Sequence, residues 1–116
     1  MKSKMSDQRM IDYTDMLDGL TWEIETAITN YELEVVEDLH DEENDIIIRA
    51  MKWSRGDKHH TIIITPFGQL RHVSKNTPIN LLHQIVNTAV ATMWDIVGVE
   101  YEDGSKYTPP LLKNKS

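Results

Sequence analysis

The chain has 116 residues, no cysteine and a formal net charge of −7 at pH 7. Its length suits one domain with its own core, and the lack of cysteine excludes disulfides, thiolate catalysis and Cys-based zinc sites. Net acidity argues against direct nonspecific nucleic-acid binding, which depends on positive charge. No apolar stretch is long enough to cross a membrane and no secretory signal is recognisable, so we expect a cytoplasmic protein.

The charge is distributed unevenly along the sequence. Between Asp7 and Asp45 there are fourteen Asp or Glu residues and a single base, Arg9. Between Ile46 and Met93 the sign reverses, with six Lys or Arg residues and one acid, Asp57. Such asymmetry indicates that different surfaces attract different partners, although it does not identify them.

The first element is a helix over residues 6–30. Its apolar side chains recur at alternating spacings of three and four residues, which places them on one helical stripe. The stripe comprises Met10, Tyr13, Leu17, Leu20, Ile24, Ala27 and Tyr31. Gly19 is unfavourable inside a helix, so we expect it to allow close packing or to mark a bend.

Four strands are predicted next, over residues 31–36, 45–53, 59–65 and 70–73. The first alternates apolar and acidic residues, and the second and third contain runs of isoleucine, which favours strands. Short turns join them, with Gly56 placed to adopt positive φ between the second and third. Short connections predict an antiparallel meander.

A second helix is predicted from Thr77–Pro78, a favourable start, to a stop at Gly98. Val99, Glu100 and Tyr101 are expected to add a brief extended segment. The predicted fold class is therefore α+β in the order α-β-β-β-β-α, with an N-terminal and a C-terminal helix flanking a four-stranded meander in two layers. We expect one domain over residues 1–105 and a flexible tail over 106–116.

The second strand carries apolar residues on both of its faces. Ile46, Ile48 and Ala50 point one way, and Ile47, Met51 and Trp53 point the other. If both helices cover one face, the other face presents an apolar patch, which predicts a homodimer or higher oligomer built on the sheet. One helix on each face is the alternative arrangement.

No motif indicates catalysis, a metal site or a cofactor. His59 and His60 are adjacent on a strand and point to opposite faces, which is unsuitable for chelating one ion. Asp12, Asp15 and Asp18 are spread around the helix and fit a solvated face better than an acid/base pair. There is no glycine-rich phosphate loop and no serine-nucleophile motif. We therefore expect a non-enzymatic protein.

Two functional hypotheses follow from the charge pattern. The first is a small regulator or inhibitor that binds a partner macromolecule, most simply a protein, by electrostatic complementarity; the composition also fits an accessory protein of a mobile element. Its predicted contact surface consists of Asp12, Asp15, Asp18, Glu32, Glu34, Asp41, Glu42 and Glu43.

The alternative is an oligomer that binds a small phosphorylated ligand such as a nucleotide, because Arg side chains and neighbouring aromatic rings suit phosphate contact and base stacking. The residues predicted for this site are Arg49, Trp53, Arg55, Lys58, His60 and Arg71. These cations also have a simpler role, which is to balance the acidic helix and first strand across the sheet.

Overall fold

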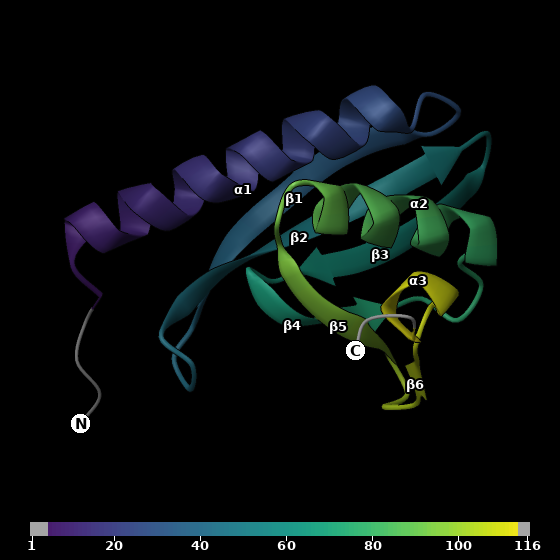
Figure 1. The fold of residues 1–116 in the computed structure, drawn as a ribbon. Coiled ribbons are helices and arrows are strands. Elements are labelled where there is room, and N and C mark those ends of the chain that lie inside the picture. The colour runs from purple at the N-terminus through teal and green to yellow at the C-terminus, as the bar shows by residue number, and fades with distance from the viewer. Residues whose placement is uncertain (1–4, 114–116) are drawn as a thin grey trace.

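The structure is a computed structural model and describes residues 5–113. It confirms a mixed α+β fold, in which helices pack on a six-stranded sheet with strand order β1-β2-β3-β4-β5-β6 (Figure 1). The elements in chain order are α1 (Asp7–Ala27), β1 (Glu32–Asp41), β2 (Ile46–Arg55), β3 (Lys58–Ile64), β4 (Phe67–Val73), α2 (Ile79–Ala91), β5 (Asp95–Tyr101), β6 (Lys106–Tyr107) and α3 (Pro110–Lys113).

Helix α1 begins and packs where its sequence pattern indicates. The Ser6 hydroxyl caps its N-terminus by accepting a hydrogen bond from the backbone N–H of Arg9 at 3.2 Å. Leu17, Leu20 and Ile24 are buried, whereas the first turns of the helix remain largely exposed. Gly19 does not serve close packing, because a Cβ built there would meet no atom within 4 Å.

The first four strands pair in an antiparallel meander, which agrees in part with the prediction. However, β1 continues to Asp41, beyond the predicted end at Val36, and β4 begins at Phe67 rather than at Leu70. Strand β1 lies at the edge of the sheet, and its register against β2 shifts between Val35 and Glu37 at a β-bulge. The turn between β2 and β3 contains Gly56 at φ 65, as its position predicts.

The C-terminal third differs from the predicted fold. Helix α2 ends at Ala91 rather than at Gly98, and β5 follows it and pairs with β4 in parallel. The sheet is therefore mixed, and α2 is a crossover between neighbouring parallel strands rather than a terminal helix. The apolar residues of β5, such as Ile96, continue the spacing of α2, and no glycine separates the two elements.

Residues 106–113, predicted to belong to a flexible tail, contain strand β6 and helix α3. The His83 ring nitrogen Nε2 and the Tyr107 hydroxyl are hydrogen bonded at 2.7 Å, and Leu112 is buried in the core. These contacts attach the segment to α2. The rest of the predicted tail, residues 114–116, lies outside the described residues.

Both long helices pack on the same face of the sheet, where α1 contacts β2 and α2 (Figure 1). Ile47, Met51 and Trp53 belong to the core beneath the two helices. Ile46 and Ile48 alternate with these residues along β2 and therefore point to the other face of the sheet. Those two are nevertheless only 1% and 8% exposed. The apolar patch on which the oligomer hypothesis depends is thus smaller than the sequence indicates, and oligomerisation stays a prediction.

In the part of the chain that the structure describes, no helix has both the length and the apolar character needed to cross a bilayer.

Candidate functional site

Three of the predicted acidic contact residues are neutralised within the fold. Asp18 accepts from Arg49 Nη2 at 2.8 Å, Asp41 accepts from Arg71 Nη1 at 2.9 Å, and Glu34 lies 3.4 Å from Lys52 Nζ. These pairs join β2 or β4 to α1 or β1. Their carboxylates are therefore less available to an external cation than the charge count alone suggests.

Asp41 is the most strongly perturbed of these acids. Its Oδ2 accepts a hydrogen bond from the Asn44 side-chain amide at 2.9 Å and another from Arg71 at 2.9 Å. The Asn44 hydrogen bond, together with Arg71, lowers the pKa of Asp41 to about 2, because both contacts favour the charged carboxylate. Asp41 therefore stabilises the β1–β2 turn.

Arg49 is buried beneath α1 and is fully occupied by intramolecular contacts. Its Nε and Nη2 donate to the two carboxylate oxygens of Asp38 at 2.7 and 3.0 Å, and its Nη1 donates to the Thr21 hydroxyl at 3.0 Å. The hydrogen bond to Asp38, and then the one to Asp18, raises the pKa of Arg49. Arg49 thus connects α1, β1 and β2.

The predicted ligand site is consequently divided by the fold. Arg49 and Trp53 are buried on the helix-facing side of β2, and Arg71 pairs with Asp41. The remaining three predicted residues, Arg55, Lys58 and His60, line one pocket of about 480 Å³, which we call the basic pocket. Its other lining residues are Tyr31, Asp57, Asn76 and Pro78.

A larger cleft lies at the opposite end of the molecule, between the first turns of α1, the β3–β4 turn and the α2–β5 connection. Its volume is about 670 Å³, within the range of roughly 300–1,000 Å³ that is typical of ligand sites. We call it the apolar cleft. It is lined by Arg9, Asp12, Tyr13, Met16, Pro66, Phe67, Thr92, Met93, Trp94 and Asp95.

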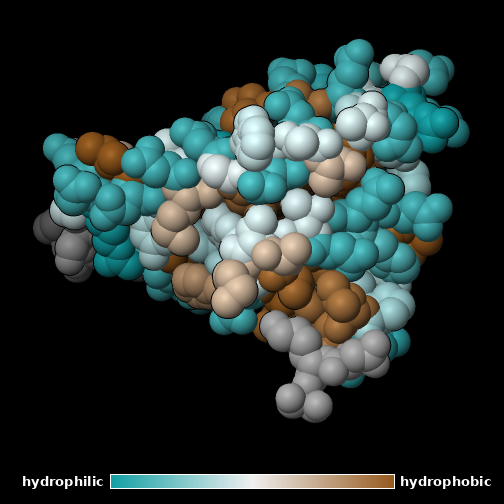
Figure 2. Space-filling model, turned by 45° about the horizontal axis from the view of Figure 1, so that its top comes forward, coloured by the Kyte–Doolittle hydropathy of each residue, from teal (hydrophilic) through white to brown (hydrophobic). Residues whose placement is uncertain are grey.

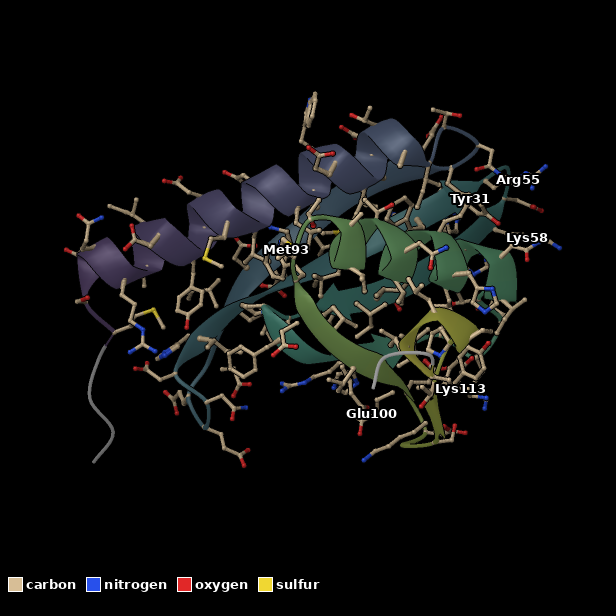
Figure 3. The ribbon with its side chains drawn as sticks, in the orientation of Figure 1. Tyr31, Arg55, Lys58, Met93, Glu100 and Lys113 are labelled. Carbon is tan, nitrogen blue, oxygen red and sulfur yellow. The ribbon has the colours of Figure 1, made fainter. Side chains whose placement is uncertain are left out.

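Met93 is the most unusual residue of the apolar cleft. It has φ 72, in the left-handed region, and its side chain is 90% exposed (Figure 3). The Trp94 N–H donates to the Ala89 carbonyl at 2.9 Å, and the Met93 N–H donates to the Val90 carbonyl at 3.0 Å. This is a Schellman motif, in which the position of Met93 is usually glycine.

Other apolar side chains of this cleft also face solvent. Met16 and Phe67 are both exposed; the face seen in Figure 2 combines hydrophilic areas toward its outline with pale and brown, more apolar areas near its middle. Methionine and aromatic residues are enriched where proteins bind one another, since they offer large and adaptable contact areas. The arrangement is thus typical of a protein-binding surface.

Carboxylates border the apolar cleft. Asp12 and Asp95 are among its lining residues. Arg9 joins the cleft to the β1–β2 turn by donating to the carboxylate of Asp45 at 2.9 Å and to its backbone carbonyl at 2.9 Å. That turn carries Glu42 and Glu43, both exposed and, among the described residues, without a cation within 4.0 Å.

Comparison with protein-family models, with curated proteins and with solved structures gives no match.

The residues of the predicted acidic surface do not lie together in the fold. Asp12 lines the apolar cleft, whereas Glu42 and Glu43 lie on the β1–β2 turn, which the Arg9–Asp45 contact joins to the cleft. Asp15 lies on the exposed side of α1 near this end, and Glu32 lies at the opposite end, where β1 begins. The remaining members are the paired carboxylates described above.

The apolar half of this site was missed from the sequence. Met93 and Trp94 fall inside the predicted second helix, and Pro66 and Phe67 inside a predicted turn, so nothing marked them as surface anchors. The available signal was the Pro-Phe-Gly tripeptide, which places an aromatic residue at a turn where burial is difficult.

The histidines do not assemble into a recognisable reactive centre. Ser54 Oγ and His59 Nδ1 are 2.9 Å apart on the exposed β2–β3 hairpin, but within the described residues no carboxylate orients the ring, as it would in a catalytic triad. No group of three or more His, Asp or Glu side chains in residues 5–113 is arranged to hold a metal ion.

Proposed function

We propose that this chain is a small protein-binding regulator whose apolar cleft receives a basic segment of a partner protein. The observation that carries the proposal is Met93, which is 90% exposed and held in a left-handed conformation. It lines a cleft together with two acids, Asp12 and Asp95, and one base, Arg9, which is paired with Asp45. A strained backbone conformation that also exposes an apolar side chain is a reason to look for function, because neither feature favours the isolated fold.

The chemistry of the cleft specifies what the partner must present. Met16, Phe67 and Met93 require an apolar or aromatic anchor, which would remove their surface from water. Glu42, Glu43 and the acids of the cleft wall require Lys or Arg beside that anchor. A basic segment with one large apolar residue satisfies both requirements.

The proposal can be tested with a peptide library displayed against the purified protein, followed by fluorescence-anisotropy titrations of the selected sequences. We expect selection of peptides that combine Lys or Arg with a large apolar residue. Their affinity should fall about tenfold in the double variant Glu42→Lys/Glu43→Lys, because each exposed charge contact contributes about 0.2–1 kcal/mol and reversal adds repulsion. The salt dependence of binding should also become weaker.

Glu23→Lys/Glu25→Lys is the matched control, because both residues are exposed acids on the last turns of α1, away from the cleft, and their reversal changes the net charge equally. It should change affinity little. Selection of peptides without basic residues, or an equal response to reversal at Glu23 and Glu25 and at the turn, would contradict the proposal.

A further inference from the structure

The basic pocket differs chemically from the rest of the surface. Its two cations, Arg55 and Lys58, adjoin the tight β2–β3 turn, and the short loop after α1 brings Tyr31 beside them (Figure 3). Within the described residues, neither cation has a carboxylate within 4.0 Å. In a protein with a charge of −7, the lining of this pocket has a local excess of positive charge, two cations against Asp57.

Tyr31 orients Arg55 without neutralising it. The guanidinium carbon of Arg55 lies over the Tyr31 ring, 5.9 Å from its centroid. Such a cation–π contact restricts the side chain, while the planar fork of N–H donors stays available for an oxyanion. A positioned guanidinium loses less conformational entropy when it binds phosphate than a free one does.

The wall of the pocket is polar and well supported. His60 is buried, its ring packs edge-on against Tyr31 with centroids 6.2 Å apart, and its Nδ1 lies 3.2 Å from Asn76 Oδ1. The pocket is therefore built by residues of three different segments rather than by one mobile hairpin.

The start of α2 adds a favourable field at the same wall. Pro78, which lines the pocket, is the N-cap residue of α2; it provides no side-chain cap, and the first turn has no acidic residue. The first N–H groups of a helix lack intrahelical acceptors and favour negative charge nearby. This supports the charge of Arg55 and Lys58 but would not define a site alone.

We infer that the basic pocket binds the phosphate group of a small phosphorylated molecule, independently of the apolar cleft. Arg55 would bind phosphate oxygens through two N–H donors and Lys58 would act as a point charge. Asp57, which also lines the pocket, opposes the anion and limits its affinity. The volume of about 480 Å³ accommodates a ligand larger than phosphate alone.

The inference is testable by titrating ¹⁵N-labelled protein with inorganic phosphate, with adenosine 5′-monophosphate and with adenosine as an uncharged control. Amide signals around Gly56, Lys58 and Asn76 should shift with both phosphate compounds and not with adenosine. Arg55→Ala and Lys58→Ala should each weaken binding about tenfold, as expected for loss of a charge-assisted contact.

Two matched variants distinguish this pocket from general charge effects. Lys52→Ala removes a cation that already pairs with Glu34, so affinity should stay within about twofold of the wild type. Asp57→Asn should increase affinity several-fold, because a repulsive charge disappears. Shifts that spread evenly over the surface, the absence of shifts at millimolar phosphate, or equal losses in Lys52→Ala and Arg55→Ala would overturn the inference.

Discussion

Replacing Met93 with glycine should stabilise the fold while removing an apolar side chain from the proposed binding cleft. A non-glycine residue in the left-handed region costs about 1–2 kcal/mol, and glycine, which avoids this cost, loses about 0.5–1 kcal/mol more backbone entropy on folding. Since Met93 is 90% exposed, few contacts are lost. The free energy of unfolding should therefore rise by about 0.5–1 kcal/mol, which for a slope of about 1–2 kcal/mol/M moves the urea midpoint up by about 0.5 M.

The measurement is urea unfolding followed by tryptophan fluorescence, with Trp53 as a buried reporter. Met93→Ala is the control, because it removes the side chain and keeps the backbone strain. Its urea midpoint should match the wild type, and both variants should bind the selected peptides less tightly. If Met93→Gly unfolds at lower urea than Met93→Ala, the reasoning from backbone strain is refuted.

Three further predictions concern stability. Gly19→Ala should raise the free energy of unfolding by about 0.5–1 kcal/mol in urea titrations, because the position is helical and a Cβ there meets open space; destabilisation would show an unrecognised packing role. Arg49→Met should lower the melting temperature by several degrees in a thermal scan, because Asp38 and Asp18 lose their cation. We expect the free energy of unfolding to fall by about 2 kcal/mol, less than for a fully buried pair, because the Asp38 side chain is 30% exposed. An unchanged melting temperature would contradict the connecting role of Arg49. The low pKa of Asp41 should contribute about 1 kcal/mol to the free energy of unfolding, after allowance for solvent screening; this contribution is complete above about pH 4 and is lost as the pH falls toward 2. Asp41→Asn should therefore reduce the loss of stability in acid, measured by unfolding at a series of pH values. A pH profile identical to that of the wild type would argue against this role of Asp41.

The first two-thirds of the fold could be predicted from the sequence because its periodicities are unambiguous. Leu17, Leu20 and Ile24 recur at helical spacing, and the isoleucine runs of β2 and β3 are joined by a tight turn at Gly56. Such local signals determine elements and short connections. They do not determine where a helix ends when the next strand continues its apolar spacing.

The boundary between α2 and β5 illustrates this failure. Helical spacing runs on from Ala89 to Ile96, and the reversal depends on a left-handed residue that sequences usually mark with glycine. Here the residue is Met93, which gives no such signal. Because Met93 occupies a position where glycine is usual, the sequence indicated neither the end of the helix nor an exposed apolar residue at the cleft.

The candidate sites were predictable only where they are local in sequence. Arg55 and Lys58 flank one tight turn, so their proximity follows from the hairpin. Alternation along β2 also placed Arg49 on the same side as Trp53. It did not reveal that this side faces α1, because the choice of covered face depends on packing between distant segments.

The acidic outer strand has a consequence for solution behaviour at low pH. Within residues 5–113, strand β1 has no strand partner on its outer side; it carries the exposed residues Glu32, Glu34 and Glu37, and its bulge lies between Val35 and Glu37. Carboxylates and a bulge on an outer strand are two devices by which natural sheets discourage strand addition by neighbouring chains. Protonation of these glutamates would remove one of the two safeguards, which makes β1 the expected starting point for fibril growth in acid.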